Sequence, residues 1–146
     1  MGDTYNKEDK KANKFIHELN ISYKKEVGMY IVNIKDVKEL KTPHGKSVRW
    51  LLSTEIGVPN FEMRYFEVTR ESEPSEDKHP WEHEVFVVKG EGIVKSGGVE
   101  KKVKPGDAIF IPPNEPHMFM NVKEEPFGFI CVIPKGCEDH VKEKRI

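Results

Sequence analysis

The stretch DKHPWEHEVFVVKGEG, residues 77–92, decides the fold assignment because it joins two histidines and an acid to a strand-like run. Asp77, His79 and His83 are separated by two and four residues. Alternate side chains of an extended strand point to the same side, so these three can converge on one ion where a strand begins near Pro80. Neutral imidazole is a common ligand for Zn, Fe, Mn, Ni and Cu. The spacing alone leaves two interpretations open, a metal site or a group of polar loop residues.

A third histidine, His117, opens a later strand-like run directly after the turn PPNEP at 112–116. One imidazole from a neighbouring strand would give three imidazoles and one carboxylate, with one or two positions left for water or substrate. The alternative is that His117 only caps the turn. The other histidines are isolated among charged or turn residues, and we expect solvated side chains there: His17, His44 and His140.

The rest of the chain predicts an all-β domain. Short apolar runs alternate with turn residues from about residue 27, and such spacing is typical of a β-sandwich or barrel. Gly97-Gly98 is typical of a tight hairpin. A thin apolar stripe within 5–19 predicts a short N-terminal helix or arm, which we place at 1–26, ahead of one β-barrel domain at 27–146. The expected strands are 28–34, 48–54, 61–68, 84–88, 91–96, 99–103, 108–111, 117–122 and 127–133.

Composition excludes several function classes. The length of 146 residues suits one domain, and 24 Lys and Arg against 25 Asp and Glu argue against a basic nucleic-acid binder. No apolar run approaches the roughly 20 residues that span a bilayer. The first residues lack the apolar region of a secretory signal, and the two cysteines form no motif, so we expect a cytoplasmic protein.

Two expected strands, 48–54 and 108–111, are apolar on both faces. A lone sandwich needs only one apolar face per strand. The second face must be covered by the N-terminal segment or by another subunit, and we expect a homodimer.

Two motifs resemble those of the cupin superfamily. The first runs G-x5-H-x-H-x3,4-E-x6-G, and here His79 takes the second histidine position, His83 the glutamate position and Gly90 the closing glycine. Asp77 stands in the first histidine position, and Glu71 stands where the motif opens with glycine.

The second motif runs G-x5-P-x-G-x2-H-x3-N and matches at Gly106, Pro112, His117 and Asn121. Asn114 replaces its middle glycine, and asparagine tolerates the same left-handed turn conformation. The two motifs cover residues 77–121 in the right order.

The resemblance implies a double-stranded β-helix, the jelly-roll barrel of cupins. It implies one divalent transition metal per chain, held by His79, His83 and His117, with Asp77 as the candidate fourth ligand. The run HPWEHEVFVVKGEG is similar to small single-domain cupins with an all-histidine manganese site. Manganese or iron is therefore favoured, and zinc or nickel is the alternative.

Strand alternation nominates further cavity residues, each with a structural alternative. Arg64 either faces inward, where it would attract a carboxylate or phosphate, or outward to solvent. Asn121 either orients a ligand or makes strand-end hydrogen bonds, and Cys131 is either a soft neighbour of the metal or a small buried side chain. Trp81 forms a wall or a lid, and two aromatic residues share the inward face: Phe119 and Phe129.

The function implied by the resemblance is a metalloenzyme of the dioxygenase or oxidoreductase type that acts on a small organic molecule. One alternative is a sugar-isomerase-like reaction. Another is a non-catalytic module that binds a metal or a metabolite such as a sugar. Fold similarity does not by itself select among these functions.

Overall fold

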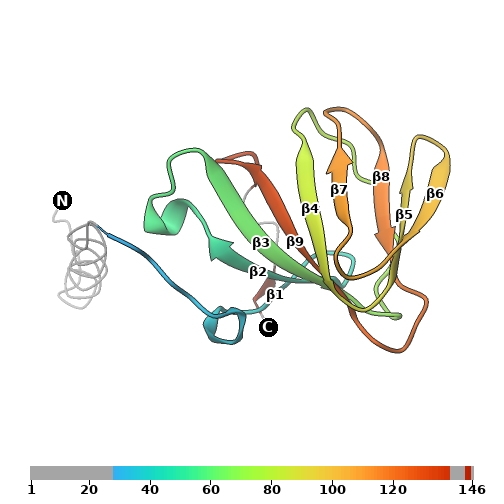
Figure 1. Ribbon diagram of the computed structural model, residues 1–146, viewed down its shortest axis with the longest axis horizontal. Helices are drawn as coiled ribbons and strands as arrows, with labels where there is room; N and C mark the ends of the chain where they lie inside the picture. The colour runs from blue at the N-terminus through green and yellow to red at the C-terminus, as the bar shows by residue number, and fades with distance from the viewer. Residues whose placement is uncertain (1–27, 139–143, 146) are drawn as a thin grey trace, which may run out of the picture. The chain divides into compact units, whose positions relative to one another are not determined.

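The computed structural model describes residues 28–138 and 144–145 (Figure 1). Within them the only helical segments are two short 3₁₀ turns, η1 (Ile34–Asp36) and η2 (Thr54–Ile56). The chain divides into two units, Met1–Ile31 and Val32–Ile146, and the second holds every helix and strand of the described residues. Its strands are β1 (Leu40–Lys41), β2 (Ser47–Leu52), β3 (Phe61–Val68), β4 (His83–Lys89), β5 (Gly92–Ser96), β6 (Val99–Val103), β7 (Ala108–Ile111), β8 (His117–Met120), β9 (Phe127–Pro134) and β10 (Lys144–Arg145).

The strands form two antiparallel sheets, as Figure 1 shows. One sheet has the order β10-β1-β2-β3-β9-β4-β7, and the other has the order β6-β5-β8. β9 lies between β3 and β4, although the three are far apart in the chain. This crossing connectivity confirms the predicted all-β barrel class.

Turn chemistry fixes the predicted breaks. Gly97 and Gly98 both have positive φ, 56° and 78°, as the two-residue hairpin between β5 and β6 requires. Asn114 has φ 63°, so it adopts the left-handed conformation expected from its place in the second motif.

The core lies between the two sheets and is filled by aliphatic and aromatic side chains, including Val48, Val87 and Phe127. Its packing leaves little space at Gly92, where an added Cβ would lie 2.1 Å from the Phe127 ring. A side chain at Gly92 therefore requires Phe127 to move, which a close-packed interior resists.

The predicted strand at 28–34 is wrong. Residues 28–33 form no strand, and η1 begins at Ile34. The apolar residues that suggested the strand are exposed, Met29 by 88% and Ile31 by 81%. An apolar run forms a strand only where a partner strand is available, and this one pairs with none in the described part of the chain. The predicted N-terminal helix or arm at 1–26 lies outside the described residues.

The outer face of β4, β7 and β9 is largely apolar apart from Glu84, with Phe86 exposed by 49% and Phe110 by 58%. The expectation that β7 is apolar on both faces is therefore confirmed, while its cover by a second subunit stays a prediction. No helix in the described residues is both long and apolar enough to cross a membrane.

Candidate metal centre

Three histidines come together at one end of the barrel. Their candidate ligand atoms all lie within 4.8 Å of one another: His79, His83 and His117. His83 is the first residue of β4 and His117 the first of β8, so both sit where a strand leaves a loop. The fold thus brings together histidines of the two motifs that are up to 38 positions apart in the chain.

The segment before β4 is held by backbone hydrogen bonds. Asp77 and His117 exchange two N–H···O bonds of 2.9 Å, and Asn114 N–H donates to the carbonyl of His79 at 2.7 Å. The strand start expected near Pro80 lies instead at His83, so Asp77 and His79 belong to the segment before β4 and not to the strand. Pro80 supplies no N–H for a ladder there. His79 reaches the other two imidazoles from this anchored loop.

Each imidazole uses its Nδ1 in a second contact. Nδ1 of His79 lies 2.8 Å from the Trp81 carbonyl, and Nδ1 of His117 lies 2.8 Å from the Glu115 carbonyl. A carbonyl only accepts, so both Nδ1 atoms carry the proton and both Nε2 atoms keep a lone pair. Nδ1 of His83 lies 3.0 Å from Sγ of Cys131. When this Nδ1 donates to the sulfur, all three Nε2 atoms are available to one cation.

The donor set fits a divalent metal. Nε2 of His83 lies 2.7 Å from Nε2 of His79, and two lone pairs at that distance repel unless a cation or proton lies between them. Burial, followed by the charges of Arg64, His79 and His117, lowers the pKa of His83 to about 2. Burial also lowers the pKa of His117. Neutral imidazoles are the form that binds metal, and this site favours them.

An aromatic wall borders the histidines. The Trp81 ring stacks on the His79 imidazole with centroids 4.3 Å apart and planes 5° from parallel. Phe119 and Phe129 stack on each other at 4.7 Å and line the same cavity. Trp81 Nε1 is buried and has no hydrogen-bond partner among the described residues. Trp81 is therefore part of the wall and restricts how the His79 ring turns.

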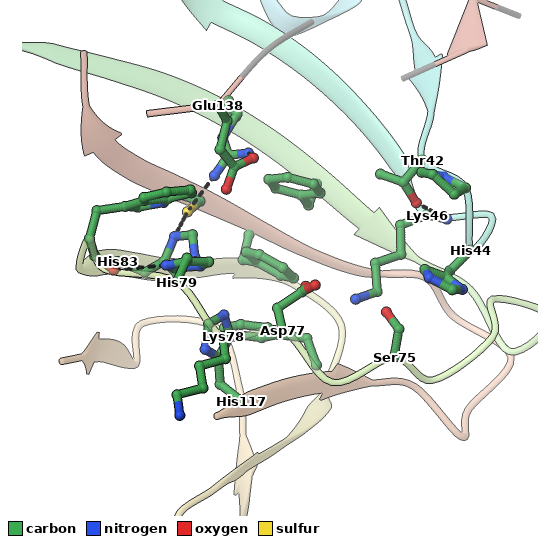
Figure 2. A pocket seen from close by; sticks show the side chains of 17 residues that line it. Thr42, His44, Lys46, Ser75, Asp77, Lys78, His79, His83, His117 and Glu138 are labelled. Atoms are coloured by element: carbon green, nitrogen blue, oxygen red, sulfur yellow. Dashed lines mark hydrogen bonds and ion pairs between the residues drawn. The ribbon is translucent and has the colours of Figure 1, made fainter. Parts of the chain in front are cut away.

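The histidines open into a cavity of about 350 Å³. Besides the three histidines and the aromatic wall, charged and polar side chains line it, most of them labelled in Figure 2. Such a volume suits a small organic molecule.

Arg64 faces inward, is 1% exposed and lines this cavity. Its Nη1 forms an ion pair with Glu138, and its Nη2 donates to Sγ of Cys131 at 3.4 Å. Its guanidinium also lies over the Phe66 ring at 4.8 Å from the centroid. Arg64 is thus a neutralised charge, connected through Cys131 to His83.

The remaining sequence candidates differ in position. Cys131 is buried and lines the cavity beside His83. Asn121 does not line it, because its amide donates to the carbonyls of Val68 and Glu125. This is the strand-end alternative, and it ties the start of the β8–β9 loop to β3.

Asp77 lines the cavity, but its carboxylate does not belong to the three-histidine cluster. Figure 2 shows it directed toward Lys46. A fourth-ligand role stays a prediction and requires the side chain to turn toward the imidazoles.

Sequence reasoning missed eight of the residues that line the cavity, among them Lys46, Glu138 and His44. Lys46 and Glu138 are ordinary charges in a chain that is 34% charged, and neither lies in a motif. His44 was expected to be solvated; it does line the cavity, while its side chain is 50% exposed and 3.6 Å from Glu73. A polar loop residue becomes recognisable only when the fold brings it to the barrel mouth.

Comparisons with known proteins agree with this architecture. The Cupin domain family model matches residues 65–133. The chain is 33% identical over 96 residues to 1-methylthio-D-xylulose 5-phosphate methylsulfurylase of Rhodospirillum rubrum. This alignment covers 66% of this chain and 61% of that protein. The chain thus spans about three fifths of that curated relative.

Solved structures extend the comparison. The polyketide cyclase RemF from Streptomyces resistomycificus aligns with a TM-score of 0.68 and 31% identity, covering 82% of this chain and 86% of that one. An RmlC-like cupin from Shewanella frigidimarina aligns with a TM-score of 0.64 at 19% identity, covering 77% and 96%, and so supports the fold alone. With two matching motifs, this barrel and these relatives, the chain belongs to the cupin superfamily.

Proposed function

We propose that this protein is a divalent-metal-dependent enzyme acting on a small organic molecule, with dioxygenase-type oxidoreductase chemistry as the first reaction to test. The observation that carries the proposal is the convergence of three imidazoles at the wall of a cavity of about 350 Å³, with their candidate ligand atoms within 4.8 Å of one another and Nδ1 of two of them in contact with carbonyls. Three neutral ligands leave the full charge of the ion available to polarise a bound oxygen atom.

His79, His83 and His117 would hold the ion, with Asp77 as the candidate fourth ligand from the cavity side. When bound, a divalent metal supplies Lewis acidity, and manganese or iron also supplies redox chemistry. The chain's own residues position the ligands: the carbonyls of Trp81 and Glu115 fix two imidazole tautomers.

The aromatic wall and the ion pair of Arg64 and Glu138 have separate roles in this proposal. Trp81, Phe119 and Phe129 exclude water from the side of the cavity next to the histidines. Glu138 neutralises Arg64, so that the buried guanidinium does not repel a cation at the site.

A second candidate, an isomerase-like reaction, has one observation in its favour. Lys46 and Asp77, an amine and a carboxylate, line the same cavity as the histidines, and such groups can transfer protons during isomerisation. The relative from Rhodospirillum rubrum, whose name specifies a sugar phosphate, makes such substrates reasonable to test.

The experiment combines metal analysis with turnover. Protein loaded with manganese, iron, zinc or nickel is tested for oxygen consumption with small phenols, diketones and enols. His117→Gln is the inactive variant and Lys101→Gln the control, because Lys101 is exposed on β6 and does not line the cavity. Oxygen uptake with manganese or iron that His117→Gln abolishes and Lys101→Gln keeps supports the dioxygenase-type reaction. Turnover of a sugar phosphate with zinc or nickel and without oxygen uptake would instead favour the isomerase-like reaction.

A further inference from the structure

A buried lysine lies in the cavity away from any motif. Lys46 directly precedes β2, and its residue is 8% exposed. The loop that carries it is fixed by two hydrogen bonds with Thr42: Thr42 N–H donates to the Lys46 carbonyl at 2.9 Å, and Lys46 N–H donates to Thr42 Oγ1 at 3.1 Å. The side chain is therefore held toward the cavity by a defined turn, and it lines the cavity with Thr42 and Ser75.

The ammonium of Lys46 has no hydrogen bond or ion pair with any side chain that the structure describes. Burial lowers the pKa of Lys46, and the charge of Asp77 opposes this by raising it. A buried cation without a hydrogen-bonded counter-ion is costly, because it loses water without gaining an equivalent contact. An anionic ligand group would supply that contact.

The charges around the cavity favour such a ligand. Arg64 is neutralised by Glu138, while Lys46 and the exposed Lys78 face only one further acid on the cavity lining, Asp77. Asp77 is exposed, and Figure 2 shows its carboxylate near the Lys46 ammonium. A dication at the histidines would add two positive charges. The occupied cavity is then clearly cationic, and electrostatic complementarity favours an anion.

We propose that the end of the cavity formed by Lys46, Thr42 and Ser75 binds the acidic group of the substrate, a carboxylate or a phosphate monoester. The hydroxyls of Thr42 and Ser75 complement the ammonium, since both can donate to an oxyanion. This inference rests on the proposed function only in assigning the substrate to the same cavity. Anion binding by Lys46 does not itself require the metal.

The test measures binding of two probes, inorganic phosphate and acetate, to the metal-loaded protein by titration calorimetry. Lys46→Met removes the charge at similar length, Lys46→Arg restores it, and Lys101→Met is the matched control because Lys101 is exposed on β6. One charge-assisted hydrogen bond is worth about 1.5–3 kcal/mol, so Lys46→Met should lower the binding affinity for the probe about ten- to hundredfold. Lys46→Arg should recover most of the affinity, and Lys101→Met should not change it. Preference for phosphate or acetate identifies which acidic group the site takes.

Metal content is measured on the same samples, which separates the two proposals. If Lys46→Met binds both probes as wild type does, or if wild type binds neither at millimolar concentration, the anion site is refuted whatever the metal content. If wild type takes up no metal but loses phosphate affinity on Lys46→Met, the anion site stands and the proposed metalloenzyme fails. A His83→Ala variant that lacks metal and retains the Lys46-dependent affinity supports the same separation.

Discussion

The buried ion pair of Arg64 and Glu138 allows a quantitative prediction of folding stability. The Arg64 side chain is 2% exposed and the Glu138 side chain 23%. Arginine keeps its proton in proteins, so Glu138→Gln removes the carboxylate that neutralises this buried guanidinium. Removing one partner of a buried pair costs about 3–5 kcal/mol. Because Glu138 is partly hydrated, we expect Glu138→Gln and Arg64→Met each to lower the free energy of unfolding by about 3 kcal/mol.

The double variant distinguishes this explanation from simple loss of contacts. Arg64→Met with Glu138→Gln removes both charges and loses mainly the interaction of the guanidinium with Trp50 and Phe66, worth about 2 kcal/mol when desolvated. The double variant should therefore be more stable than either single variant. Free energies of unfolding come from urea titrations followed by circular dichroism at one pH.

An exposed pair supplies the control. Arg70 and Glu124 also form an ion pair, but their side chains are 56% and 87% exposed, so Glu124→Gln should cost less than about 1 kcal/mol. The reasoning is refuted if Glu138→Gln costs no more than Glu124→Gln. It is also refuted if the costs of the two cavity substitutions simply add in the double variant.

Three further predictions concern the metal centre, alkaline stability and the outer face. Cys131→Ala removes the sulfur beside Nδ1 of His83 and should weaken metal affinity about 10- to 100-fold in chelator competition. Cys131→Ser should keep most of the affinity. Equal affinity of the wild type and both variants would contradict the role of the contact between Cys131 and His83. Burial raises the pKa of Tyr65 above its usual value of 10, so stability present below pH 10 should fall as pH rises through that value, by about 1.4 kcal/mol per unit. In urea titrations Tyr65→Phe should flatten that slope, and an unchanged slope would argue against Tyr65 as its source. Light scattering should give the mass of a homodimer for the wild type, and a lower mass for Phe110→Lys, which places a charge on the exposed face. A monomeric wild type would contradict the predicted homodimer.

The sequence predicts the barrel well because its strands are short, apolar and separated by residues with defined turn geometry. β3 occupies the predicted range 61–68, and β6 and β7 match their predicted ranges too. The run at 28–34 has the same apolar character but no strand partner, and pairing is a tertiary property that a local pattern does not contain.

The candidate site is only partly predictable for a related reason. The three histidines follow from motif spacing, because spacing in a barrel fixes which strand ends meet. The inward face of β3 is harder to predict from the sequence, since Glu62 and Arg64 share that face and both are 1% exposed. Their burial is possible only because distant partners satisfy them. Glu62 accepts from Thr54 N–H at 2.8 Å, and Arg64 pairs with Glu138 from beyond the last long strand.

The metal content of the protein, purified without an affinity tag or chelator, tests the central claim most directly. The account predicts about one divalent transition metal per chain in the wild type and close to none in His83→Ala and His117→Ala. Both variants should retain the β-sheet circular dichroism of the wild type. A wild type that takes up no metal after each ion is added back, or a variant that keeps a full equivalent, would contradict the three-histidine metal centre.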